Sequence, residues 1–211
     1  FEPLYEQISN RIEVYKPFPE RFTKIAEWVA KKPGYTFEHL DSRQFDKFAA
    51  DFMEIYNDAW KDFDNFTQIS YATIRETFEK LKVIMDEHLI WFSYVNGEPA
   101  SMIVIVPDTN ELIYNLNGRL NLTGKLKFLI NKMRRRNKRM RAIIMGTKEK
   151  FQKHGLESAM FIKLKEYVLP LQQYEELELS WVGDFNDKML AIHEATGAVF
   201  SKRHITYRCV F

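Results

Sequence analysis

A short glycine-containing loop at residues 152–157 has the composition of an anion-binding site. It reads Gln-Lys-His-Gly-Leu-Glu and comes directly before a helical pattern at residues 155–169. The first turn of a helix leaves four backbone N–H groups without intrahelical partners, and the helix dipole adds partial positive charge at the same place. Such a place suits a phosphate or pyrophosphate, so this loop is the starting point for any chemistry in the chain.

The elements around the loop alternate between strand and helix. The pattern predicts strands at 141–147, 174–182 and 199–210, and a further helix at 186–196.

The preceding part of the chain predicts a strand, helices and a hairpin. A weak alternation at 4–15 suggests a strand, and Pro17 and Pro19 open a helix. Further elements are an extended segment at 35–40, an amphipathic helix at 45–60, a helix capped by Ser70, and strands at 89–95 and 102–106 joined by Asn96-Gly97. This order predicts an α/β layered domain with a mixed sheet.

Length and composition describe an ordinary globular chain. Its 211 residues, 45% hydrophobic and 28% charged, suit one domain or one domain with an attached piece. Cys209 is the only cysteine, so no disulfide can form within the chain. With no long apolar run and no signal-peptide pattern, we expect a cytoplasmic protein without a transmembrane segment. The start at Phe1 suggests a fragment of a longer protein.

Positive charge is concentrated in one segment. Residues 112–148 contain 11 Lys or Arg and no Asp or Glu, whereas the rest of the chain has 20 basic and 29 acidic residues. We expect a basic helical insertion at 108–140, broken near Gly118 and Gly124.

Three interpretations of the basic segment at 119–141 stay open. A solvated helix face is the default. A nucleic-acid patch is disfavoured, because Phe128 is the only aromatic residue nearby. A helix lying on anionic lipid is the third, although the pattern is short and mixed. Its apolar side would contain Leu120, Leu122, Leu126, Phe128, Leu129 and Ile130.

The order of elements and the loop together resemble the GNAT superfamily of acyl-CoA N-acyltransferases. In the family's loop motif, Q/R-x-x-G-x-G/A, Gln152 and Gly155 match, but Glu157 stands where Gly or Ala is usual. The family's next motif has an Asn after the fifth strand and a helix ending in Y-x-x-x-G-F. Here Asn186 and Gly197 match, His193 occupies the Tyr position and Ala198 replaces Phe.

The resemblance implies a GNAT-like domain at residues 35–211. Its fold would be a mixed, mostly antiparallel sheet with helices on both faces, carrying the basic insertion. Nearly the whole chain is also similar to the C-terminal half of uncharacterised bacterial GNAT-like proteins, through phrases at 17–22 and 179–186. Residues 1–34 would then be an N-terminal segment, comprising the tail of a preceding GNAT-like half and one helix.

The resemblance also implies a site for acetyl-CoA or coenzyme A. The strand at 141–147 should splay from the strand at 174–182 to admit the pantetheine arm, to which Met145 and Thr147 would offer backbone groups, and Lys150 can add charge near the loop. The residues implied in coenzyme binding are Met145, Thr147, Gln152, Lys153, His154, Gly155, Leu156, Glu157, Ser158 and Asn186. The Glu157 carboxylate either points at the diphosphate and repels it, or lies along the first helical turn, where it suits the dipole.

By its position, His193 is the candidate for donating a proton to the departing thiolate, since histidine titrates near neutrality. The alternative is a polar residue at a helix edge. Glu178, Ser180 and Asp184 are candidates for the base that takes a proton from the amine, and none is assigned. Glu178 is equally well explained as a solvated sheet residue.

The resemblance favours an acyl-CoA-dependent N-acyltransferase, specifically acetyl transfer to a primary amine of a small molecule or peptide by direct attack. The alternative is a catalytically silent GNAT-fold domain that binds a ligand or supports its partner half. We do not expect nucleic acid as a partner. The five histidines show no paired metal-ligand spacing, so we expect no metal site.

Overall fold

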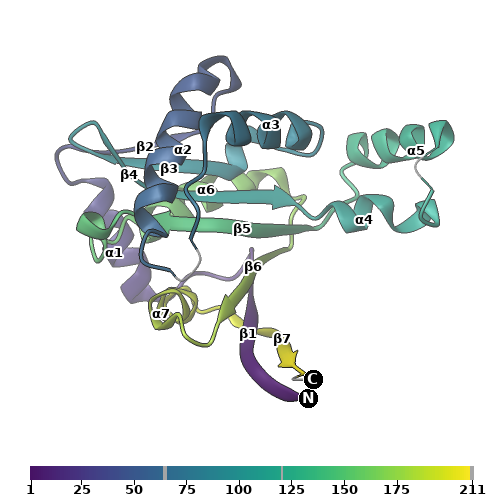
Figure 1. Ribbon diagram of the computed structural model, residues 1–211. Coiled ribbons are helices and arrows are strands. Elements are labelled where there is room, and N and C mark those ends of the chain that lie inside the picture. The colour runs from purple at the N-terminus through teal and green to yellow at the C-terminus, as the bar shows by residue number, and fades with distance from the viewer. Residues whose placement is uncertain (64–65, 120, 210–211) are drawn as a thin grey trace. The chain divides into compact units, whose positions relative to one another are not determined.

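The computed structural model describes residues 1–63, 66–119 and 121–209 (Figure 1). Leu120, which was expected on the apolar side of the insertion, lies outside the described residues. The strands are β1 (Glu2–Glu13), β2 (Tyr35–His39), β3 (Ile90–Val95), β4 (Glu98–Pro107), β5 (Arg139–Thr147), β6 (Glu176–Gly183) and β7 (Val199–Arg208). The α-helices are α1 (Glu20–Ala30), α2 (Phe45–Ala59), α3 (Tyr71–Leu81), α4 (Thr109–Ile113), α5 (Leu122–Met133), α6 (Leu156–Leu171) and α7 (Asp187–Ala195).

The chain divides into two compact units. The first contains residues 1–22, 108–142 and 168–211, and the second contains residues 23–107 and 143–167. Strand β5 passes from one unit to the other.

In the first unit, β1 lies between β6 and β7 and is antiparallel to both. The strands at the two ends of the chain are therefore neighbours, as Figure 1 shows. The start of β5 is parallel to β6, with a register that runs from Arg139 opposite Glu176 to Ala142 opposite Leu179. The expected splay beyond these pairs stays a prediction.

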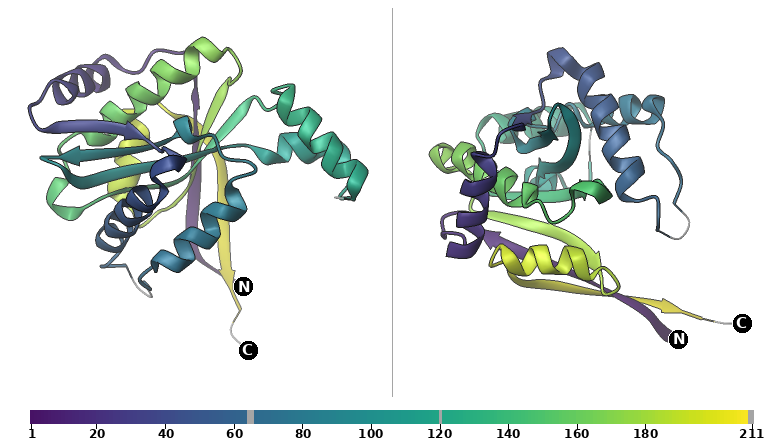
Figure 2. Two further views of the ribbon diagram at one scale, coloured as in Figure 1. Left: turned by 90° about the horizontal axis from the view of Figure 1, so that it is seen from above. Right: turned by 90° about the vertical axis from the view of Figure 1, so that its left-hand side faces the viewer.

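In the second unit, β2, β3 and β4 form an antiparallel meander, and the Asn96-Gly97 turn joins the last two strands. Helices cover both faces of these strands (Figure 2). On one face, α2 and α3 contribute Phe48, Phe52 and Phe78 to a core with Phe92. On the other face, α1 and α6 pack their apolar residues around Val95. The amphipathic helix predicted at 45–60 thus packs its apolar side into the core.

Strand β5 has residues in both units. The hydrogen-bonded strand order of the sheet is β2-β3-β4-β5-β6-β1-β7. The predicted fold class, a mixed and mostly antiparallel sheet with helices, is confirmed. The domain boundary at residue 34 stays a prediction, and the structure adds that β1 pairs within the sheet.

The basic insertion is helical, but one of its predicted breaks is wrong. The chain turns at Asn117 and Gly118, which both have positive φ. Gly124 instead lies inside the first turn of α5, where the Asn121 side chain accepts a hydrogen bond from its N–H at 2.9 Å. A Cβ at Gly124 would meet the Arg119 carbonyl oxygen at 2.2 Å, so close packing explains this glycine.

Candidate active site

The predicted anion-binding loop connects β5 to α6 in the second unit. Lys153 and Gly155 both have positive φ, 67° and 77°. A Cβ at Gly155 would lie 2.7 Å from Cγ2 of Ile25 and 3.2 Å from Cγ2 of Val29, so the loop presses against α1. Glycine is thus required at position 155 for two reasons: its φ is positive, and the close approach of α1 leaves no room for a Cβ. The loop ends at Leu156, the first residue of a 16-residue helix.

A tyrosine and a histidine fix the loop to β2. Nδ1 of His154 lies 2.8 Å from the hydroxyl of Tyr35, and the two rings stack. Lys32 donates to the same hydroxyl at 2.9 Å. His154 therefore holds the loop in place, and its ring packs edge-on against Phe151.

A buried lysine at the end of β5 was missed by the sequence reasoning. Lys148 is 3% exposed and donates to the carboxylates of Glu54 and Glu98, the latter at 3.0 Å. Lys150 also pairs with Glu98, at 2.6 Å. Much of the charge that Lys150 was expected to offer the loop is thus neutralised by a carboxylate. No motif marked Glu98, because it is distant in sequence from the loop.

The Glu157 side chain accepts a hydrogen bond from the end of β5. The Thr147 hydroxyl donates to its carboxylate at 2.5 Å. The same hydroxyl lies 2.7 Å from the Ser101 hydroxyl, which donates to the Gly146 carbonyl at 3.0 Å. Glu157 thus ties the first turn of α6 to β5, although its negative charge stays near the loop amides.

Two hydrogen bonds at the end of β5 are made to β4, one of them through the Ser101 side-chain hydroxyl. The N–H of Lys148 donates to the Ala100 carbonyl on β4, and the Gly146 carbonyl accepts from Ser101 on the same strand. Because successive residues of a strand direct their backbone groups to opposite edges, those of Met145 and Thr147 face the other edge of β5. This is the edge at which a pantetheine arm was expected.

Asn186 and His193 belong to the first unit, and the structure groups them around α7. The Asn186 side chain caps α7 by accepting from the Met189 N–H at 3.1 Å. His193 is 3% exposed, and the Asn10 side-chain amide donates to its Nδ1 at 3.1 Å. Burial lowers the pKa of His193 to about 4. The expected titration near neutrality is therefore not supported by its surroundings.

One of the three candidates for the base is not a solvated sheet residue. Glu178 is 1% exposed and accepts from Arg141 at 2.5 Å and Lys202 at 2.6 Å. Burial by itself would raise the pKa of Glu178, but these two partners lower it below its usual value. Asp184 is exposed and accepts from the Glu6 N–H, and Ser180 is half-buried.

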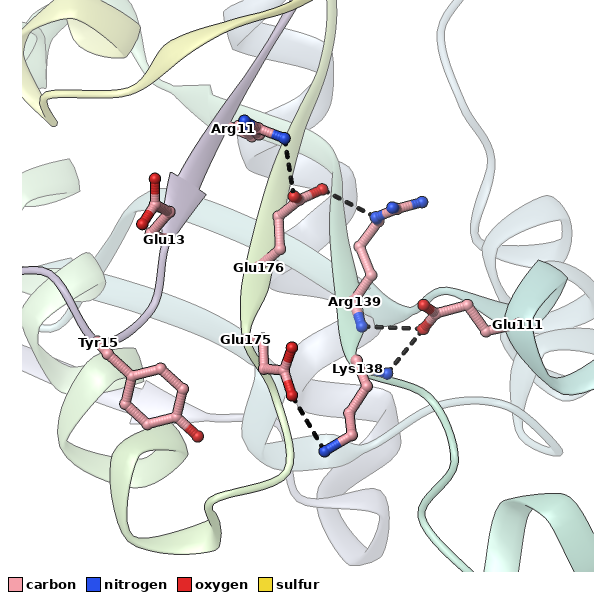
Figure 3. Close-up of a pocket in the computed structure, with 8 residues that line it drawn as sticks. All are labelled: Arg11, Glu13, Tyr15, Glu111, Lys138, Arg139, Glu175 and Glu176. Carbon is pink, nitrogen blue, oxygen red and sulfur yellow. Dashed lines mark hydrogen bonds and ion pairs between the residues drawn. The ribbon is translucent and has the colours of Figure 1, made fainter.

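A separate polar pocket of about 510 Å³ lies in the first unit, and none of the predicted site residues line it (Figure 3). Its charged groups pair with one another. Arg139 contacts Glu176 at 2.8 Å, while the N–H groups of Lys138 and Arg139 donate to Glu111 at 2.7 and 2.9 Å. These internal pairs explain the pocket's charges without a ligand. The lining residues are Arg11, Glu13, Tyr15, Glu111, Lys138, Arg139, Glu175 and Glu176.

The described part of the chain contains neither a metal-binding cluster nor a membrane-spanning helix. Within residues 1–63, 66–119 and 121–209, no group of three or more His, Cys, Asp or Glu side chains is placed to hold a metal ion. In the same ranges, no helix combines the length and apolar character that crossing a bilayer requires.

Solved structures with the same arrangement decide the fold. A GCN5-related N-acetyltransferase from Sphaerobacter thermophilus superposes with a TM-score of 0.60 at 11% identity, covering 97% of this chain and 51% of that one. A tandem GNAT protein from the clavulanic acid biosynthesis pathway gives 0.58 at 13% identity, covering 95% and 52%. The chain has a GNAT fold. The superfamily resemblance seen in the sequence is confirmed at the level of fold.

Two curated proteins are similar in sequence, while no family model matches the chain. The bacterial ceramide synthase of Caulobacter vibrioides (strain NA1000 / CB15N) is 32% identical over 177 residues, which cover 82% of this chain and 46% of the relative. Protein YghO of Escherichia coli (strain K12) is 26% identical over 196 residues, covering 90% and 49%. This GNAT-fold chain therefore spans about half the length of the curated relatives that it matches.

Proposed function

We propose that this GNAT-fold chain is part of an acyl-CoA-dependent N-acyltransferase. The observation that carries the proposal is the loop between β5 and α6. Positive φ at Lys153 and Gly155 leads the chain into a 16-residue helix whose first amides have no intrahelical partners. The coenzyme A pyrophosphate would bind backbone amides within residues 153–158, except that of His154, whose N–H donates to the Phe151 carbonyl at 3.3 Å.

Other predicted residues would serve the same coenzyme. Met145 and Thr147 would offer backbone groups to the pantetheine arm, and Gln152, His154, Leu156 and Ser158 would shape the loop. Lys153 is exposed and would add positive charge beside the phosphates. Asn186, which caps α7, would be a secondary contact.

Bound acyl-CoA would supply the activated acyl group. The acceptor amine would form the new C–N bond as the C–S bond breaks, with one proton lost by the amine and one gained by the sulfur. A backbone N–H of β5 aimed at the thioester oxygen would stabilise its developing negative charge. His193 is neutral at pH 7, because its pKa of about 4 leaves few imidazolium ions. Its proposed part is therefore limited to hydrogen bonding through Nε2–H, since Nδ1 accepts from Asn10.

The name of the Caulobacter vibrioides relative, a ceramide synthase, favours an acyl group longer than acetyl. A ceramide is an amide of a fatty acid with a long-chain amino alcohol, so the name of that relative suggests a fatty acyl-CoA and an amino-alcohol acceptor. The GNAT resemblance, by contrast, leads us to expect an acetyl group and a small amine. Both reactions join an acyl group to an amine nitrogen, and parallel assays with acetyl-CoA and palmitoyl-CoA on amino-alcohol and simple amine acceptors distinguish them.

A catalytically silent domain is the second candidate. Glu157 favours it, because the carboxylate places negative charge beside the proposed diphosphate site. The low pKa of His193 also favours it. Coenzyme binding without turnover of any acceptor, in a protein that also contains the preceding half, would support this candidate.

The charge of Glu157 provides a direct test of the site. Glu157→Gln removes the charge and can still accept the Thr147 hydrogen bond, so we expect coenzyme A to bind about threefold to tenfold more tightly, or about 0.7–1.4 kcal/mol. Isothermal titration calorimetry of the 211-residue chain measures the change.

Glu166→Gln is the matched control, because it makes the same charge change on α6 more than two turns away. It should leave the affinity unchanged. Equal tightening by both variants would indicate general electrostatics rather than a local site. Absence of binding to either protein at millimolar coenzyme A would contradict the proposal.

A further inference from the structure

Helix α5 carries an exposed apolar stripe. Leu122, Leu126, Leu129 and Met133 are 85%, 59%, 49% and 83% exposed, and Ile130 beside them is 38% exposed. The first four follow the spacing i, i+4, i+7 and i+11, which places them on one side of a helix. Single exposed apolar residues are ordinary, but a continuous stripe along three turns marks an interaction surface.

The opposite side of α5 is the side that packs on the protein. Its least exposed residues are Gly124, Phe128 and Asn131, which follow the spacing i, i+4 and i+7. The Asn131 side chain donates to the Leu112 carbonyl of α4 at 2.9 Å, so this side faces α4 (Figure 1). The stripe therefore lies on the side of α5 opposite to the side that faces α4; the 3-10 helix at Tyr114–Leu116, directly after α4, also contacts α5.

Basic residues flank the stripe on both sides. At 100° per residue, Lys125 and Lys132 fall on one flank and Lys127 on the other. Arg134, Arg135 and Arg136 follow directly and are exposed. No acidic residue occurs from 112 to 148. A partner that suits this face has to be apolar at its centre and negatively charged at its rim.

We propose that α5 docks on an anionic lipid surface, lying in its plane with the leucine stripe inserted. An amphipathic helix with Leu on one face and Lys or Arg beside it binds at the headgroup boundary, through apolar burial and attraction to anionic lipid together. Nucleic acid explains the basic residues but not the exposed leucines, and a second copy of α5 would bring like charges together. The proposal does not depend on acyl transfer.

The test uses the full 211-residue chain and flotation with vesicles. One set contains phosphatidylcholine with 30% phosphatidylglycerol, and the other phosphatidylcholine alone. We expect binding to the anionic vesicles, at least tenfold weaker binding to the neutral ones, and weakening at high salt because exposed charges are screened.

Paired variants separate the two parts of the surface. Leu126→Ser with Leu129→Ser should reduce binding to anionic vesicles at least tenfold, and both residues are exposed enough to leave the fold unchanged. Val83→Ser, at a position 55% exposed, is the apolar control. Lys125→Glu with Lys127→Glu should also weaken binding tenfold. Lys31→Glu with Lys82→Glu is its charge-matched control at exposed positions and should bind as the parent does.

Three results would overturn the proposal. One is equal binding by the α5 variants and their controls. Another is binding to duplex DNA of the same charge concentration without binding to anionic vesicles. The last is concentration-dependent dimerisation, measured by light scattering, that the Leu126/Leu129 variant abolishes while vesicle binding is absent. A melting temperature unchanged within 2 °C confirms that each variant is folded.

Discussion

At the scale of single residues, His193 shows how burial changes a chemical role. Its ring is 3% exposed and accepts from Asn10, and burial lowers its pKa to about 4. Below pH 6.5, the His193 side chain binds a proton in the unfolded chain, whereas in the folded chain it does so only at about pH 4. The contribution of His193 to the free energy of unfolding therefore has its full value above pH 6.5 and declines as the pH falls toward 4.

We expect the free energy of unfolding to fall by about 2 kcal/mol between pH 7.5 and pH 5 because of His193. Urea unfolding at the two pH values measures it, and His193→Gln should lose that part of the pH dependence. His204→Gln, at an exposed position, is the control and should keep it. Equal pH dependence in parent and His193→Gln would show that the ring is not protonated more readily in the unfolded chain.

At the scale of elements, the loop and α6 are held by contacts from three other elements. Gly155 packs on α1. The side chains of His154 and Glu157 form hydrogen bonds with Tyr35 of β2 and Thr147 of β5, respectively. The structure gives the proposed anion site a rigid frame, and this suits a ligand that is bound by backbone amides. None of these three partners follows from the spacing of residues 152–157.

Helix α5 depends on one buried polar contact. Asn131→Ala removes the hydrogen bond to the Leu112 carbonyl and leaves a small cavity, so we expect α5 to become less stable on α4 by about 1–2 kcal/mol. Trypsin should then cleave the basic segment at 119–138 several times faster. Asn110→Ala, which changes an exposed asparagine on α4, should leave the rate unchanged. No difference between these variants would mean that the contact does not secure α5.

At the scale of the whole molecule, the first strand is an internal part of the sheet. Ile8 lies opposite Val182 of β6 and Arg203 of β7. Ile8→Pro should lower the free energy of unfolding by about 3 kcal/mol or more, because proline removes a ladder hydrogen bond and does not fit the middle of a sheet.

Leu4→Pro is the control for this change. Leu4 is 53% exposed and sits at an irregularity in the register with β7, so proline there should cost much less. Urea unfolding compares the two variants. A similar loss in both would show that the middle of β1 contributes no more than its end.

The sequence alone predicted the order of elements, the α/β fold and the position of the loop. Periodicity and turn residues are local properties, so they identify α2, the Asn96-Gly97 turn and the helix after residue 155. Only the tertiary structure paired β1 with β6 and β7, buried Glu178 and His193, joined Glu157 to Thr147 and exposed the leucines of α5. These features arise from contacts between residues far apart in the chain, and burial and pKa depend on such contacts rather than on sequence neighbours.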